Sequence, residues 1–285
     1  MKKLFAILVL LILATSAFGG YYYYSQIYRP EQYKKAVLPL YEKIGLQMAI
    51  PSLPEIQDSA DFLLVLNALE QSEMNLEKVK KDFVLLKPPK KLKDFHRNFS
   101  EGLELALSAI DESKTRTNFW LKADDFLKEM EKTRTTLEET TRMTKQIRTV
   151  KDLRGFWRPP LQEVKSLANE MFTQETAALE DATFKEIQSL WKETEGGIDY
   201  ILSLLNSLPS ALPLEQISSV LSQEQNQESE ESFRKIEKLI DFLEPKIRKG
   251  GAYNISGFND FSKQAELSEL SFKIYQQIED FKKKR

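Results

Sequence analysis

Apolar side chains recur at spacings of three and four residues along most of this 285-residue chain. The clearest run lies between residues 92 and 110, and its apolar members project within about 60° of one line when successive residues are turned by 100°. Those members are Leu92, Phe95, Phe99, Leu103, Ala106, Leu107 and Ile110. Such a stripe is typical of an amphipathic helix that packs on partner helices. With only 10 glycines in the chain, the pattern predicts an all-α fold, an elongated antiparallel bundle of long helices.

A second regular stripe precedes the first one, and the pair Pro88–Pro89 separates them. It consists of Phe62, Val65, Leu66, Leu69, Leu76, Val79 and Phe83. A proline pair stops a helix and restricts the residue before it to extended geometry. We therefore expect residues 59–158 to form a helical hairpin region, and we expect Pro159–Pro160 to end it. Residues 25–58 should hold a first helix from Pro30, kinked or weakened at Pro39, and then a linker.

Residues 159–285 form a C-terminal helical region in this interpretation. Its stripes cover residues 161–190, 198–208, 233–247 and 267–281. We expect Gly196–Gly197 to interrupt the helical pattern. The polar, acidic run from Gln223 to Glu231 contains no apolar residue, so we interpret it as a solvated loop or a helix end.

The N-terminus allows two interpretations. Lys2 and Lys3 precede the apolar run Leu4 to Phe18, and four consecutive tyrosines follow at Tyr21, Tyr22, Tyr23 and Tyr24. A basic region, an apolar core and small residues near Gly19 are typical of a cleaved secretory signal. If the apolar stretch instead continues to Tyr24, a helix over 4–24 is roughly 30 Å long at about 1.5 Å per residue, which matches the hydrocarbon thickness of a bilayer. We favour this transmembrane signal-anchor.

The anchor fixes the expected location of the rest of the chain. Lys2 and Lys3 hold residues 1–3 in the cytoplasm by the positive-inside bias, so the chain beyond about Tyr24 is expected outside. Tyrosine rings suit the headgroup level, so we expect the residues from Tyr21 to Tyr24 at the membrane interface. If the segment is cleaved, the product is a secreted helical bundle. The lipid bilayer is the first expected partner in our preferred interpretation.

Few residues carry recognisable chemistry. The chain has no cysteine and a single histidine, His96, which rules out paired histidine or cysteine metal sites; we expect no metal and no cofactor. His96 lies at the edge of a helical stripe, so we expect it to pack or to cap the hairpin, although Ser100 one turn away leaves a Ser–His pair conceivable. Adjacent acids such as Asp124–Asp125 point about 100° apart on a helix and are expected on solvated faces.

One basic cluster has a possible binding role. Residues 142–158 contain a single acid, Asp152, and six cations, which are Arg142, Lys145, Arg148, Lys151, Arg154 and Arg158. Their spacing keeps neighbours on nearly one helical face, which suits anionic lipid headgroups or an anionic envelope polymer. We favour the alternative that they form a solvated face balanced by the acidic stretch from Asp124 to Glu139.

The sequence therefore predicts a membrane-anchored extracytoplasmic helical bundle of the prokaryotic envelope. Its expected role is structural or partner-binding, with another envelope protein as a candidate partner and no catalysis. The net charge of -2 does not support binding to nucleic acid. A ligand-binding or sensor-type helical domain is the alternative, and an enzyme without a recognisable motif is the third class.

Overall fold

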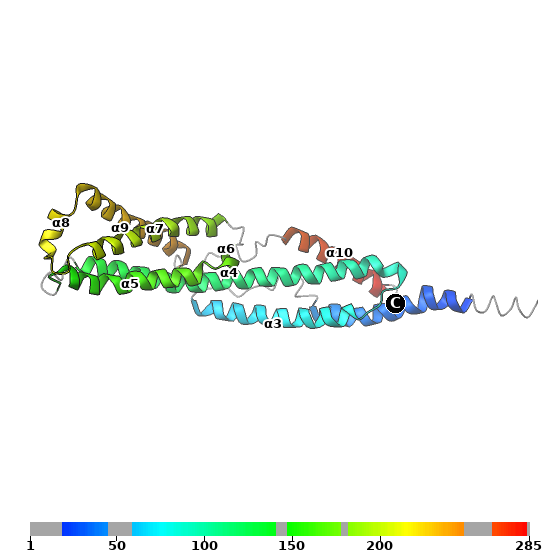
Figure 1. Cartoon of the computed structure of the whole chain (residues 1–285). Coiled ribbons are helices and arrows are strands. Elements are labelled where there is room, and N and C mark those ends of the chain that lie inside the picture. Colours follow the sequence, from blue (N-terminus) through cyan, green and yellow to red (C-terminus); the bar gives the residue numbers. More distant parts are fainter. Residues whose placement is uncertain (1–18, 45–58, 141–146, 178–181, 248–263, 284–285) are drawn as a thin grey trace, which may run out of the picture. The chain divides into compact units, whose positions relative to one another are not determined.

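The computed structural model describes residues 19–44, 59–140, 147–177, 182–247 and 264–283, and every regular element within these ranges is helical (Figure 1). The elements are η1 (Tyr24–Tyr28), α2 (Arg29–Ile44), α3 (Ser59–Val84), η2 (Lys90–Leu92), α4 (Lys93–Thr140), α5 (Val150–Met171), α6 (Gln174–Ala177), α7 (Ala182–Ser207), η3 (Leu214–Gln216), α8 (Ile217–Val220), α9 (Gln223–Ile247) and α10 (Gln264–Lys283). The prediction of an all-α chain built from long helices is confirmed.

The first helix of the described chain begins before Pro30, the residue at which the sequence predicts its start. Residues 19–23 are α-helical, η1 is a π-helical turn, and α2 follows without a break and continues through Pro39. No helix among the described residues is long and apolar enough to cross a membrane. Residues 4–18 of the expected anchor, and the expected linker before Ser59, lie outside the described residues.

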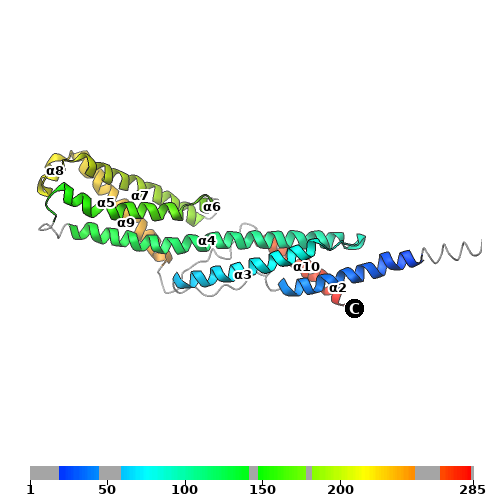
Figure 2. The same ribbon diagram turned by 60° about the horizontal axis from the view of Figure 1, so that its bottom comes forward.

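Residue contacts divide the chain into two units, and unit 1 comprises residues 1–53, 68–111 and 263–285. Its described helices are α2, most of α3, the start of α4, and α10 (Figure 2). Aromatic residues of the stripes predicted for α3 and α4 meet in a buried cluster, in which the ring centroids of Phe83 and Phe99 are 4.4 Å apart. Phe281 of α10 joins this cluster at 4.9 Å from Phe95. The turn after Pro88–Pro89 lies where the sequence predicts it.

Unit 2 comprises residues 54–67 and 112–262. Its central contact is the pair α7 and α9, which run side by side in opposite directions, with α5 on α7 (Figures 1 and 2). The second part of α4 contributes Phe119 and Phe126, whose rings pack on Phe184 and Trp191 of α7. Trp120, Trp157 and Trp191 all belong to unit 2, and each packs against another aromatic ring.

The expected helix end at Pro159–Pro160 is wrong. Both prolines lie inside α5, where each removes one backbone hydrogen bond of the helix. The helix continues because it is held on both sides of the prolines. Thr149 and Asp152 form a capping box at its start, and the side chains of Leu153 and Leu161 are buried before and after the pair. Tertiary packing therefore overrides the local proline signal.

The expected interruption at Gly196–Gly197 is also wrong, since α7 passes through both glycines. The reason is a close helix crossing. A Cβ atom added at Gly197 would lie 3.1 Å from Cα of Ser232 on α9, whereas one added at Gly196 would meet nothing within 4 Å. One turn away, the buried Thr194 hydroxyl lies 3.1 Å from the carbonyl oxygen of Lys235. Gly197 thus permits the contact that joins α7 to α9.

The run from Gln223 to Glu231 is the exposed first part of α9, which is the second of the two structures that its composition allows. Ser222 caps this helix. Its hydroxyl accepts a 3.1 Å hydrogen bond from the Gln225 amide, and the Gln225 side chain accepts a 2.9 Å bond from the Ser222 amide. This reciprocal pair is a capping box. Glu224, in the first turn, stands near the positive end of the helix dipole, where negative charge is stabilising.

Candidate functional site: an apolar cavity in unit 2

His96 is held in the aromatic cluster of unit 1. Its Nδ1 lies 2.7 Å from the Tyr33 hydroxyl, and its ring stacks on Phe83 at a centroid distance of 4.5 Å. Burial lowers the pKa of His96 from its ordinary value of 6.5, because desolvation disfavours the charged imidazole. Burial also raises the pKa of Tyr33. These are the contacts of a neutral packing residue that is hydrogen-bonded across helices.

The acidic pair Asp124–Asp125 does not lie wholly on a solvated face as expected. Asp124 is buried, with only 3% of its surface exposed, while Asp125 is exposed. The Asp124 carboxylate lies 2.5 Å from Nζ of Lys128, one turn along α4. The hydrogen bond to Asp124 is the main reason that the pKa of Lys128 is raised. A local ion pair thus balances the buried charge, which is the usual requirement for burying a carboxylate.

Two arginines of the basic cluster bind the end of a neighbouring helix. The Arg154 guanidinium donates to the carbonyl oxygens of Leu205, Asn206 and Leu208 and to the Ser210 hydroxyl. Arg158 donates to the Asn206 side chain. The last carbonyls of a helix lack partners within the helix and carry partial negative charge, so a cation is well placed there. Neither sequence interpretation of the cluster anticipates this role.

The other members of the basic cluster are placed differently. Arg148 and Lys151 are exposed, and their backbone groups bond to the segment after α7. Arg142 and Lys145 lie outside the described residues. Asp152 accepts hydrogen bonds from the amides of Arg148 and Thr149 and from the Thr149 hydroxyl. These bonds, that of the Arg148 amide first, lower the pKa of Asp152, because they stabilise the ionised carboxylate.

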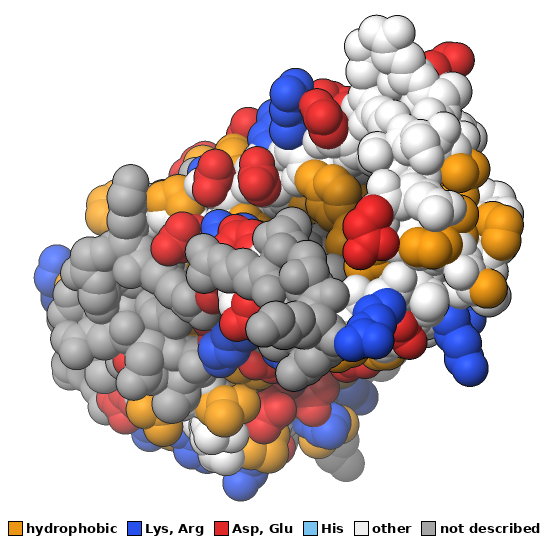
Figure 3. Space-filling model, turned by 90° about the vertical axis from the view of Figure 1, so that its left-hand side faces the viewer, with side chains coloured by type: hydrophobic (Ala, Val, Ile, Leu, Met, Phe, Trp, Pro, Cys, Tyr) orange, Lys and Arg blue, Asp and Glu red, His pale blue; other side chains and the backbone are white. Residues whose placement is uncertain are grey.

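One cavity of unit 2 has a volume of about 430 Å³ and lies between α5, α7, α9 and the segment that contains η3 and α8. This volume is within the range of small-molecule sites. Its lining from α5, from α7 and from the residue after α7 is wholly apolar, and consists of Leu153, Trp157, Ile201, Leu204, Leu205 and Leu208. Figure 3 views the molecule from the end that carries α8, and hydrophobic side chains are visible there among charged ones.

The segment after α7 covers the cavity, and it adds Leu214, Glu215, Ile217, Ser218 and Leu221 to the lining. Backbone hydrogen bonds tie this cover to the start of α5. The Val150 amide donates to the Leu212 carbonyl at 3.0 Å, and the Leu214 amide donates to the Arg148 carbonyl at 3.1 Å. Because the cover is bonded to α5, and because Arg154 holds the end of α7, the cover stands beside α7 and leaves space between them.

The wall from α9 supplies Asn226, Ser229 and Phe233. The ring of Phe233 meets Trp157 edge to face at a centroid distance of 5.5 Å, a favoured aromatic geometry. The whole lining thus combines ten apolar side chains with two serines, one asparagine and one carboxylate, Glu215. Such a surface suits a ligand with a large apolar body and a small polar head.

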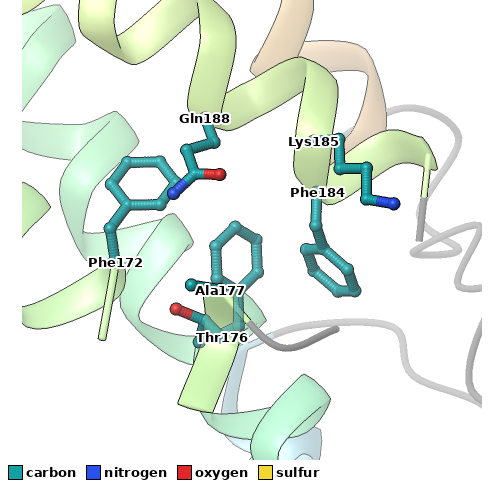
Figure 4. A pocket seen from close by; sticks show the side chains of 7 residues that line it. Phe172, Thr176, Ala177, Phe184, Lys185 and Gln188 are labelled. Carbon is teal, nitrogen blue, oxygen red and sulfur yellow. The ribbon is translucent and has the colours of Figure 1, made fainter. Parts of the chain in front are cut away.

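A second cavity is too small to be a binding site. It has a volume of about 10 Å³ and lies where α6 meets α7 (Figure 4). Figure 4 shows Phe172, Phe184 and Gln188 around it, while the Lys185 side chain extends away. This space holds at most about one water molecule. Within the described ranges, no group of three histidine, aspartate or glutamate side chains is placed to hold a metal ion.

Sequence reasoning missed the cavity because its lining residues occupy ordinary stripe positions. One signal was present, since the prolines at 209 and 213 predict a constrained turn just where the cover begins. Comparison of the chain with protein-family models, with curated proteins and with solved structures finds no match.

Proposed function

We propose that this protein is a membrane-anchored helical binding module whose ligand site is the apolar cavity of unit 2. In this proposal residues 4–24 anchor the chain in the cell membrane of a prokaryote, and the helical remainder lies on the extracytoplasmic side. The cavity is the single observation that carries the binding role. It favours the ligand-binding alternative over a purely structural scaffold, and the proposed role involves no catalysis.

The exposed tyrosines support the anchor. The exposed fractions are 70% for Tyr21, 56% for Tyr22, 57% for Tyr23 and 54% for Tyr24. Consecutive residues of a helix point about 100° apart, so these rings cover all its sides. Exposed aromatic rings on every side of a helix suit the membrane interface, where an apolar ring and a polar tip are both accommodated. Ile27 and Tyr28 extend the exposed surface into η1.

The anchor is tested by fractionation of cells that produce the full chain. We expect the protein to stay in the membrane pellet after an alkaline carbonate wash and to begin at Met1. Added protease should digest it from outside the cell membrane. A soluble protein that begins near Gly20 or Tyr21 would overturn the anchor and indicate cleavage and secretion instead.

The binding role is tested with 8-bromooctan-1-ol, a neutral apolar probe whose bromine quenches tryptophan at short range. Trp157 lines the cavity, whereas Trp120 and Trp191 are buried elsewhere in unit 2. With the full chain in lipid nanodiscs, we expect saturable quenching that is lost in Trp157→Phe. The control is free tryptophan mixed with protein-free discs, in which quenching rises linearly with probe concentration. The same linear rise with the protein would refute a ligand site.

A further inference from the structure

We propose that the cavity of unit 2 selects a single-chain amphiphile with a protonated amine head over neutral and anionic counterparts. This inference rests on the proposed ligand-binding role and adds the charge of the ligand to it. The apolar walls accept a hydrocarbon chain, and the polar groups are confined to the cover and to α9, so head and tail have separate places.

The charge of the lining is the first argument. Glu215 is the one charged side chain that lines the cavity, and it is exposed to solvent. Lysine, arginine and histidine do not occur in this lining. The hydroxyl groups of Ser218 and Ser229 and the amide of Asn226 supply acceptor oxygens for the N–H groups of an ammonium head.

The surrounding sequence has the same sign of charge. Residues 214–233, which form the cover and the first part of α9, contain five glutamates and no lysine or arginine. Two of the five, Glu230 and Glu231, form ion pairs with Arg234, the next residue of α9. Burial is the main cause of the raised pKa of Tyr200, and the negative charges of Glu228 and Glu224 nearby raise it further. A run of one sign beside an apolar cavity attracts the opposite charge and repels its own.

Two arginines of α5, Arg154 and Arg158, are not part of the cavity lining. The Arg154 guanidinium is directed at the carbonyl oxygens that end α7, and Arg158 is directed at Asn206. Both guanidinium groups keep their positive charge, but they donate to the end of α7 and do not line the cavity. A carboxylate or phosphate head would meet Glu215 without a cation in the lining to receive it, whereas an ammonium head would meet a carboxylate.

A matched series of probes tests the inference on the full chain in nanodiscs of a neutral lipid. The probes are 8-bromooctylammonium, 8-bromooctan-1-ol and 8-bromooctanoate, which share the chain and differ in the head, and quenching of Trp157 reports binding. Because Glu215 is exposed, we expect the ammonium to bind about 1.5- to 5-fold more tightly than the alcohol. The carboxylate should bind more weakly than the alcohol.

Two substitutions separate the contribution of Glu215 from bulk charge. Glu215→Lys should reverse the order of the ammonium and carboxylate probes. Glu237→Lys makes the same change in net charge at an exposed site of α9 outside the lining, and it should keep the original order. Both residues are exposed, so both variants are expected to fold.

The outcomes distinguish this inference from the proposed function. Saturable binding with equal affinity for all three heads, or a preference for the carboxylate, overturns the amine preference and leaves the ligand site in place. An order that Glu215→Lys and Glu237→Lys change equally also overturns it, since bulk charge would then be the cause. Absence of saturable quenching by every probe overturns the ligand site, and the inference falls with it.

Discussion

Replacing Gly197 by alanine isolates the energy of the closest contact between α7 and α9. The added methyl group would lie 3.1 Å from Cα and Cβ of Ser232 and 3.3 Å from its carbonyl oxygen. Carbon atoms in favourable contact are about 3.5–4.0 Å apart, so α9 has to move by several tenths of an ångström. Overpacking of this kind costs about 1–3 kcal/mol.

Gly196 provides the matched control, because it lies in the same helix and a Cβ atom there meets nothing within 4 Å. Gly196→Ala should stabilise the protein by up to about 1 kcal/mol through helix propensity alone. Gly197→Ala gains the same propensity but overpacks the contact with Ser232. Its free energy of unfolding should therefore fall below that of Gly196→Ala by about 1–3 kcal/mol.

The assay follows urea unfolding by tryptophan fluorescence. All three tryptophans belong to unit 2, so this signal reports the unit in which both glycines lie. The pair Gly196→Val and Gly197→Val should widen the difference, since valine places more atoms against Ser232. Equal stabilisation by Gly196→Ala and Gly197→Ala would refute the argument that the crossing requires glycine.

Three further predictions concern stability. His96 has a lowered pKa in the folded state, so the stability that its neutral form contributes is full above pH 6.5 and is lost as the pH falls below 6.5. In circular dichroism melts, His96→Phe should therefore lose less stability than the wild type between pH 7 and pH 5. Arg154→Met should lower the free energy of unfolding of unit 2 by about 1–3 kcal/mol, because the carbonyl oxygens at the end of α7 lose a charged donor; Lys151→Met, at an exposed site, should change it little in the same urea titration. Ser222→Ala should cost about 0.5–2 kcal/mol by removing the cap of α9, and an unchanged midpoint would contradict the capping role.

The helices were predictable from sequence because their signal is distributed over many residues. Along α4, the stripe from Leu92 to Ile110 needs no single contact to be recognised, and its members from Phe95 onward are buried or half-buried. The same holds for α10, where Leu267, Ile274 and Ile278 are buried as the spacing predicts. A period that repeats over several turns survives a wrong assignment at any one residue.

Helix ends were predicted less well, because they depend on partners distant in sequence. Pro159–Pro160 and Gly196–Gly197 carry strong local signals for an end, yet both lie within continuous helices. The first pair is overruled by burial on both sides of it, and the second serves a contact with Ser232, 35 positions beyond Gly197. A single sequence contains the residues of such contacts but not their pairing.

The candidate site combines both situations, and this explains why it escaped the sequence analysis. Its apolar walls use stripe residues that any helical bundle would bury, such as Ile201 and Leu205, so nothing distinguishes a wall of a cavity from a filled core. What keeps the space open is the backbone bonding of the cover to the start of α5, together with the bonds from Arg154 that hold the end of α7. The polar run from Gln223 to Glu231 then has two physical effects. Its first residues allow Ser222 to cap α9, and its glutamates give the cavity a negative surrounding. A run that looks like featureless solvated chain in the sequence therefore begins a wall of the cavity and adds negative charge near it, while Glu215 is the charged residue of the lining itself.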